Sequence, residues 1–316
     1  MTADAGVRPA LRRLSGAPLG LLALIVLFTI LRPTVFPDPG NLSNLLEHIA
    51  VLAIVASAQT VVMAVADFDL SVGATASFSG VIAAQLLVAG WPTTAAVAAA
   101  LAVGVVIGVV NGWLVAYLNL SAFVATLATM TALAGGSLLL TDGSTIFGLP
   151  DDFLLLGQGR PLGVPVVVLI AITVGALVWF LLSRTAQGRR WYAVGGNAEA
   201  AAYAGIDVGR TRLLAFVVSG AGAALAGLLL SSRLASAHPT AGDPLMLTSI
   251  AAVFIGLTAA QAARPGVAGT LLGVVVLGVL DNGLNLLDVN PYVQQILTGL
   301  IIIVSVGLSR RRGRRP

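Results

Sequence analysis

The sequence predicts an all-α integral membrane protein with about ten transmembrane helices. The first observation is composition, because the 316 residues are 58% hydrophobic and only 9% charged. A soluble domain carries about 25% charged residues, so this chain cannot cover a water-facing surface. The second is that apolar runs of membrane-crossing length recur along the chain. The third is that the basic residues, all of them arginine, gather between alternate runs, as in proteins that cross a membrane repeatedly.

The first apolar run resembles a signal peptide, because Leu19 to Leu31 follows Arg8, Arg12 and Arg13. No small-x-small cleavage site follows it, so we expect a retained first helix. The predicted spans cover residues 14–32, 45–66, 72–90, 93–117, 122–140, 163–182, 213–233, 245–263, 266–287 and 292–309.

The arginine distribution predicts that both termini are cytoplasmic. With the N-terminus inside, 14 of the 17 arginines fall in cytoplasmic segments, and the external side keeps Arg32, Arg160 and Arg233. We expect a cytoplasmic tail over 1–13, a single transmembrane domain over 14–309, and an Arg-rich cytoplasmic tail over 310–316. The basic tail suits anionic lipid. The lipid bilayer is therefore an expected partner, and nucleic acid is not.

Two predicted loops are longer than about 15 residues, and loops of that length are usually functional or disordered. The external one, about 141–162, carries Asp142, Asp151 and Asp152. The cytoplasmic one, about 183–212, carries five arginines. No soluble domain is predicted, so any energy-converting module would be a separate chain.

The cytoplasmic loop reads as a glycine-hinged turn followed by a short helix. Gly195 and Gly196 form the expected hinge, and Asn197 is a suitable N-cap residue. Glu199 lies in the first turn, where a negative charge complements the helix dipole. Gly205 can end the helix in a left-handed conformation. Composition alone favours an ordinary solvated connector helix over one that inserts into a groove of a partner.

This segment resembles the cytoplasmic coupling loop of ATP-binding-cassette (ABC) importer permeases. That loop contains Glu-Ala-Ala, then three further residues and a Gly, and Glu199-Ala200-Ala201 with Gly205 matches it. The wider string, aromatic-Ala-Val-Gly-Gly-Asn-x-Glu-Ala-Ala-x-x-x-Gly-Ile, is similar to the version in the ribose-type sugar permease family.

Three further stretches resemble the same family, so that the resemblance covers nearly the whole chain after residue 40. They are Asp69-Leu70-Ser71-Val72-Gly73, Ser121-Ala122-Phe123-Val124-Ala125-Thr126-Leu127-Ala128-Thr129-Met130 and Ile250-Ala251-Ala252-Val253-Phe254-Ile255-Gly256.

The chain also departs from the family pattern at three places where the family carries glycine. Ala66-Asp67-Phe68 stands for Gly-Gly-Ile, Gly256-Leu257-Thr258-Ala259 for Gly-Gly-Thr-Ser, and Arg264-Pro265-Gly266-Val267 for Gly-Gly-x-Gly. Each lost glycine removes a place for close backbone approach or positive φ. These changes leave room for a subunit that pairs with a different permease.

The resemblance implies the permease subunit of an ABC importer for a monosaccharide or sugar-like solute in a bacterial inner membrane. It also implies two related halves, inverted in the membrane, from the second to fifth and seventh to tenth helices. The implied partners are cytoplasmic ABC ATPase subunits, an extracytoplasmic solute-binding protein, and a second permease copy, identical or different. The residues that would couple to the ATPase are Gly195, Gly196, Asn197, Glu199, Ala200, Ala201 and Gly205.

We expect no enzymatic activity, no catalytic residue and no bound cofactor, with ATP hydrolysed by partner subunits. The chain has no Lys, so it has no Gly-x-x-x-x-Gly-Lys-Ser/Thr phosphate loop. It has no Cys and only two His, which makes a metal site improbable on composition.

Uncharged polar residues inside the spans are candidates to line a path for a sugar, whose hydroxyl groups need donors and acceptors without strong charge. For any one of them, an interhelical hydrogen bond is the simpler interpretation. Asp69 with Ser71 can cap the third helix, and Asp281 is either functional or simply faces outer water. The candidates are Gln59, Asn111, Thr126, Thr129, Asn282 and Asn285.

Other functions stay open on the sequence. An ABC permease for branched-chain amino acids or nucleosides has a similar helix pattern. An ion-coupled secondary transporter needs acidic residues at the membrane midplane or broken helices, whereas the acids here lie mostly at span ends. An integral membrane enzyme needs His, Asp and Glu converging at one depth, and the sequence predicts no such cluster.

Overall fold

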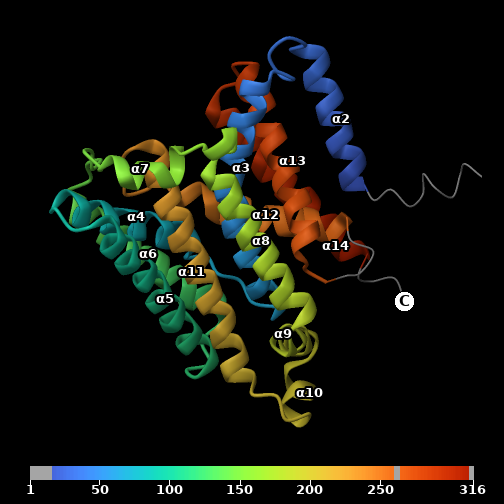
Figure 1. Ribbon diagram of the computed structural model, residues 1–316. Coiled ribbons are helices and arrows are strands. Elements are labelled where there is room, and N and C mark those ends of the chain that lie inside the picture. Colours follow the sequence, from blue (N-terminus) through green and yellow to red (C-terminus); the bar gives the residue numbers. More distant parts are fainter. Residues whose placement is uncertain (1–15, 260–263, 313–316) are drawn as a thin grey trace, which may run out of the picture. The chain divides into compact units, whose positions relative to one another are not determined.

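The computed structural model describes residues 16–259 and 264–312, which form helices joined by short connections (Figure 1). The described residues contain one isolated β-bridge, between Ile146 and Ala237. The helices are α2 (Gly16–Leu31), α3 (Pro39–Ala64), α4 (Val72–Val88), α5 (Thr93–Ala116), α6 (Ala122–Thr141), α7 (Asp151–Gln158), the 3-10 helix η1 (Pro161–Gly163), α8 (Val166–Arg184), α9 (Ala186–Gly196), α10 (Ala198–Tyr203), α11 (Val208–Leu234), α12 (Asp243–Ala259), α13 (Val267–Leu286) and α14 (Pro291–Arg312).

The expectation of an all-α membrane protein is confirmed. Each of the predicted apolar ranges overlaps a helix. Among the described residues, six helices are long and apolar enough to cross a membrane, namely α3, α5, α6, α8, α11 and α13, and α2, α4 and α12 are shorter apolar helices. The predicted tail over 1–13, residues 260–263 of the predicted eighth span and residues 313–316 of the basic tail lie outside the described residues.

The chain divides into two compact units. The larger unit covers residues 50–250, and the smaller one combines 1–49 with 251–316. Helices α3 and α12 each begin in one unit and end in the other.

Helix α11 is the central helix of the larger unit and packs against α4, α5, α7 and α9. Its contact with α5 is a backbone contact, because Gly104, Gly108 and Gly112 recur every fourth residue on one face of α5. A Cβ at Gly108 would collide with the carbonyl oxygen of Phe216, and one at Gly112 would lie 2.8 Å from the Cα of Leu213. Small residues at four-residue spacing let membrane helices approach closely, as the sequence predicts for Gly104 and Gly108.

The predicted external loop is folded onto the end of α11. The hydroxyl of Ser232 accepts a hydrogen bond from the N–H of Gly157 (2.7 Å) and donates one to the carbonyl of Phe153 (2.7 Å). Phe153 is fully buried. Within this unit, α7 lies at one end, and α9 and α10 lie at the other (Figure 1).

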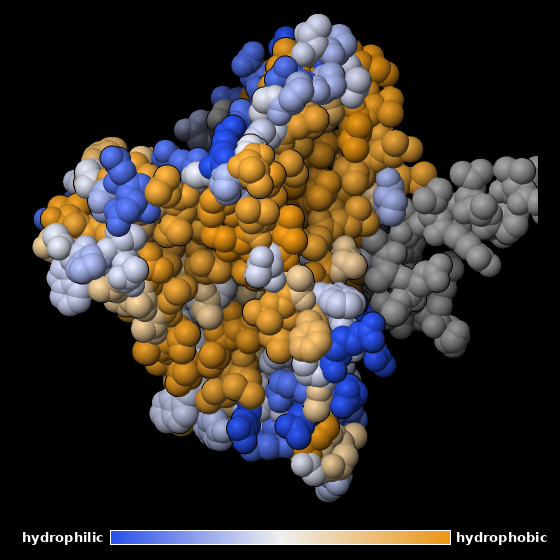
Figure 2. Space-filling model, in the orientation of Figure 1, coloured by the Kyte–Doolittle hydropathy of each residue, from blue (hydrophilic) through white to orange (hydrophobic). Residues whose placement is uncertain are grey.

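Hydrophobic residues cover the visible sides of α8 and α11, whereas hydrophilic residues gather around α9 and α10 (Figure 2). On α8 the exposed side chains include Leu169, Ile172, Leu177 and Phe180. A helix that exposes large apolar side chains along its length is suited to a lipid environment.

The smaller unit has its own core around Phe28, Phe36, Leu45, Val279 and Leu280. The rings of Phe28 and Phe36 have centroids 5.8 Å apart. A Cβ at Gly283 of α13 would collide with the Phe28 ring, so this glycine brings α2 and α13 close together.

Candidate functional site

The predicted coupling loop begins with α9, which is attached to the larger unit along one face. Thr185 caps this helix, since its hydroxyl accepts a hydrogen bond from the N–H of Gly188 (3.0 Å). Gly188, Trp191 and Val194 are buried and recur every third residue. This spacing puts all three on one side of a helix.

Two contacts fix α9 to neighbouring helices. The indole Nε1 of Trp191 donates a hydrogen bond to the carbonyl of Thr211 in α11 (3.0 Å), and the side chain is 2% exposed. At the other end of α9, Gly195 lies against the end of α3. A Cβ at Gly195 would collide with the carbonyl oxygen of Ala64 and lie 3.1 Å from the Cα of Val65. The first half of the loop is therefore a packed helix held by α3 and α11.

The expectation of a glycine hinge is wrong. Gly195 and Gly196 are the last two residues of α9 and not a turn. Helix propensity opposes glycine at these positions, but the buried face of α9 and the close approach to α3 override it. The two glycines also differ, because a Cβ at Gly196 would meet nothing within 4 Å.

The expected short helix α10 has its predicted cap and its predicted end. The side-chain Oδ1 of Asn197 accepts a hydrogen bond from the N–H of Ala200 (2.9 Å), which confirms the N-cap. Gly205 follows the helix at φ 81°, which confirms the left-handed end. The N–H of Gly205 donates a hydrogen bond to the carbonyl of Ala202 (2.9 Å), and the N–H of Ile206 donates one to the carbonyl of Ala201 (3.0 Å).

Most of α10 is exposed. Glu199, Ala200 and Tyr203 are exposed, with Tyr203 at 85%, while Ala201 is buried. This arrangement presents a small surface with one carboxylate and few bulky groups, supported by a packed α9. It is suited to docking in a groove of another protein.

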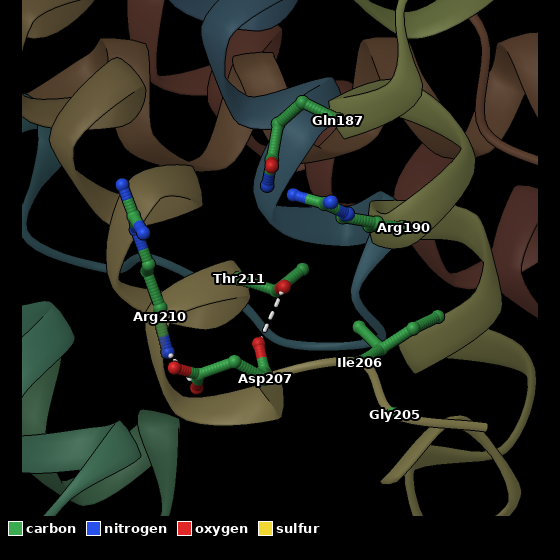
Figure 3. A pocket seen from close by; sticks show the side chains of 7 residues that line it. All are labelled: Gln187, Arg190, Gly205, Ile206, Asp207, Arg210 and Thr211. Atoms are coloured by element: carbon green, nitrogen blue, oxygen red, sulfur yellow. Dashed lines mark hydrogen bonds between the residues drawn. The ribbon is translucent and has the colours of Figure 1, made fainter.

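A pocket of about 210 Å³ lies between α9 and the start of α11. Figure 3 shows Gln187 and Arg190 reaching into it from α9, facing Asp207, Arg210 and Thr211. Asp207 caps α11, because its Oδ1 accepts a hydrogen bond from the N–H of Arg210 (2.8 Å). The turn that returns from α10 to α11 is thus ordered by a cap.

A second group of polar residues is buried inside the larger unit and centres on Asp69, in the connection between α3 and α4. Its Oδ1 accepts hydrogen bonds from the N–H (2.9 Å) and the hydroxyl (2.6 Å) of Ser71. Its Oδ2 accepts one from the hydroxyl of Ser219 in α11 (2.7 Å). Asp69 is 1% exposed, so these three bonds replace solvent around a buried carboxylate.

Three predicted path residues belong to this same network. The amide of Asn111 donates to the hydroxyl of Ser71 (2.8 Å) and accepts from that of Thr129 (2.6 Å). Thr126 accepts a hydrogen bond from the N–H of Leu70 (3.1 Å). The network joins the α3–α4 connection to α5, α6 and α11, which is the interhelical role that the sequence suggests for single residues of this type.

The other three predicted path residues lie elsewhere. Gln59 in α3 is fully buried, and neither polar atom of its side chain has a hydrogen-bond partner. In the smaller unit, Asn282 exchanges two hydrogen bonds with Asn41 (2.9 and 3.1 Å). Asn285 accepts one from Gln294 (2.8 Å). A path-lining role for all six stays a prediction.

The structure also pairs two residues that sequence reasoning did not join. Asp67 Oδ2 lies 3.3 Å from Arg212 Nε in α11, without the alignment of a hydrogen bond, so the attraction is electrostatic. Burial raises the pKa of the Asp67 carboxyl above its ordinary value, and Arg212 acts in the opposite direction. The preceding residue, Ala66, has φ 64°, at the position where the resembling family carries glycine. The glycine that the resembling family carries here was the one signal in the sequence that this connection follows an unusual backbone path.

Comparison with known proteins places these features in context. Residues 41–306 match the family described as "Branched-chain amino acid transport system / permease component". The ribose import permease protein RbsC of Bacillus subtilis is 41% identical, with 94% of this chain and 92% of the relative covered. The D-allose transport system permease protein AlsC of Escherichia coli is 35% identical (92% and 90% covered). The xylose transport system permease protein XylH of the same species is 32% identical (93% and 91%). No solved structure gives a significant match.

Proposed function

Because the chain belongs to the family of branched-chain amino acid transport system permease components, we propose that it is the membrane-spanning permease of an ABC importer for a monosaccharide. The relatives named for ribose, allose and xylose support the sugar assignment, and they agree with the ribose-type motifs of the sequence. Branched-chain amino acids, which the family description names, and nucleosides are less favoured, because the relatives named for sugars match this chain over most of their length.

The main structural support for this proposal is the arrangement of the predicted coupling loop. Its exposed helix α10 displays Glu199 and Ala200, and α9 joins it to α3 and α11 through Trp191 and Gly195. A loop that is exposed at its tip and packed at its base can transmit the movement of a docked ATPase into the transmembrane helices. The permease itself would hydrolyse no nucleotide, and separate ATPase subunits would supply the energy.

We propose ten crossings, with α7, η1, α9 and α10 outside the hydrocarbon core and both termini in the cytoplasm of a bacterial inner membrane. The proposed inverted halves are α3–α6 and α11–α14. The arginine bias supports this orientation, because it places the α9–α10 loop with its arginines inside. The six long apolar helices support a multi-pass arrangement.

The proposed orientation predicts the reactivity of single cysteines, which can be introduced cleanly because the chain has none. In intact cells or spheroplasts, Asp152→Cys is expected to react with a membrane-impermeant thiol reagent, and Glu199→Cys is not. Both positions are exposed, so access to the reagent depends on the side of the membrane. Labelling of both after permeabilisation is the control, and the opposite pattern in intact cells would reverse the orientation.

The function is tested by purifying the chain from its native host in mild detergent, together with the proteins that bind it. We expect an ABC ATPase and a second permease copy to co-purify. Proteoliposomes that contain the permease, that ATPase and the solute-binding protein are expected to take up labelled ribose, allose or xylose. Uptake should require ATP on the side of the membrane where the ATPase lies. Uptake by the permease alone under an ion gradient would instead identify a secondary transporter.

Gln59 gives a separate test of the proposed path. A buried amide without partners costs about 1–3 kcal/mol, so Gln59→Leu is expected to raise the thermal unfolding midpoint in detergent. If Gln59 contacts the solute in another state of the cycle, the same variant loses uptake although it is more stable. The neighbouring change Ala58→Leu is not a suitable control, because Ala58 packs against Gly222 of α11 and a larger side chain would disturb that contact. Gln59→Glu is the second variant to be measured. Normal uptake by Gln59→Leu would show that Gln59 does not line the solute path.

A further inference from the structure

Three contacts converge on the short connection that joins α3 to α4, residues 65–71. Gly195 of α9 lies against Ala64 and Val65, where α3 ends and the connection begins. Asp69 is bound by Ser219 of α11. Between these two, Asp67 faces Arg212. The connection is therefore held both by the base of the coupling loop and by α11.

Adjacent residues of α11 hold the two different segments. The carbonyl of Thr211 accepts the hydrogen bond of Trp191 and so binds α9. The side chain of Arg212 pairs with Asp67 and so binds the α3–α4 connection. Both residues lie in the first turns of α11, a few residues after the coupling loop ends at Gly205. The first turns of α11 are thus the point where α9 and the end of α3 are joined.

The ion pair is sheltered from solvent. The side chains of Arg212 and Asp67 are 30% and 14% exposed. Partly buried pairs are screened by salt much less than exposed ones, so their attraction persists at cellular ionic strength. Breaking such a pair also leaves one charge poorly solvated. The pair can therefore oppose separation of the two segments.

We propose that Asp67 and Arg212 are positioning residues that make the end of α3, helix α9 and the first turns of α11 move as one body. This proposal rests on the proposed transport function. Force applied to α10 by an ATPase then reaches α3 and α11 together and, through Asp69, the buried network. Without the pair, α9 can follow the ATPase while the α3–α4 connection lags behind.

The decisive quantity is the number of solute molecules moved per ATP hydrolysed in proteoliposomes that contain the full complex. For Asp67→Asn and for Arg212→Gln we expect this ratio to fall about two- to thirtyfold, the change in coupling that follows when one residue of a coupled network is altered. ATP hydrolysis itself should continue at a comparable rate. The double variant that exchanges the two charges, Asp67→Arg with Arg212→Asp, should restore the solute-to-ATP ratio most of the way to the wild-type value.

Arg210→Gln is the matched control, because Arg210 lies two residues away on α11 and faces the pocket of Figure 3. We expect its solute-to-ATP ratio to equal that of the wild type. A merely stabilising role for the ion pair would lower the amount of folded complex and leave the ratio unchanged, so an unchanged ratio in both single variants would overturn the proposal. If Asp67→Asn does not fold, Arg212→Gln alone tests the loss of the pair, and Asp67→Glu, which keeps the charge, is expected to retain a ratio near that of the wild type.

A second measurement tests the rigid movement directly. With Asp67→Cys and Arg212→Cys in the cysteine-free chain, a short bifunctional thiol reagent can replace the ion pair by a covalent link. The linked complex is expected to transport, because the two segments need not separate. Loss of transport on linking would contradict the proposal. A wild-type complex that fails to couple ATP to uptake would instead count against the proposed function, before any variant is compared.

Discussion

Replacing Gly195 by leucine is expected to lower ATP-driven uptake strongly, whereas the same change at the neighbouring Gly196 should leave uptake near the wild-type level. The reason is the contact with α3, where a Cβ at Gly195 would collide with the backbone carbonyl of Ala64. A backbone atom cannot move aside as a flexible side chain can. Overpacking of this kind costs about 1–3 kcal/mol, which corresponds to a roughly 5–150-fold change in an equilibrium.

The comparison between the two glycines separates close packing from flexibility. Both have the same backbone freedom before folding, and both end α9, but a Cβ at Gly196 meets nothing within 4 Å. Uptake should be measured in proteoliposomes at equal amounts of complex, with size-exclusion profiles to exclude misfolding. Equal loss in Gly195→Leu and Gly196→Leu would show that the segment acts as a hinge, as the sequence alone suggests, and not as a packed contact.

This difference shows where sequence reasoning reaches its limit. Hydropathy locates the helices, because the length of an apolar run is set by the thickness of the bilayer. Local chemistry also predicts the cap at Asn197 and the left-handed Gly205, since both depend on the backbone within a few residues. The role of Gly195 depends on Ala64, far away in the chain, and no local pattern distinguishes it from Gly196.

The same limit applies to the polar residues. The sequence identifies Asn111, Thr126 and Thr129 as polar side chains within spans, but their partners come from the arrangement of helices. The bond from Ser219 to Asp69 joins residues 150 positions apart. Ser219 gives no signal of its own, because a single serine in an apolar helix is common in membrane proteins. The Asp67–Arg212 pair likewise becomes visible only in three dimensions.

The Asp69 network supports the second large prediction. Asp69→Ala is expected to destabilise the protein by about 3 kcal/mol, because it leaves the donors of Ser71 and Ser219 without their acceptor in a buried site. With an unfolding entropy of about 2.1 cal/mol/K per residue, we expect the thermal unfolding midpoint of a 316-residue chain in detergent to fall by about 5 °C. The measurement is the loss of monodisperse protein after heating, followed by size-exclusion chromatography.

Two milder variants test whether the network, and not simply the volume of the side chain, is responsible. Asp69→Asn keeps an acceptor for Ser71, and the hydroxyl of Ser219 can reverse to accept from the new amide, so its loss should be small. Ser219→Ala removes one of three hydrogen bonds to the carboxylate, so its loss should be intermediate. An Asp69→Ala variant that unfolds at the wild-type temperature would show that the carboxylate contributes little to the fold. The expected order, with alanine at 69 worst and asparagine best, follows because an unpaired buried donor costs more than a hydrogen bond that has only been rearranged.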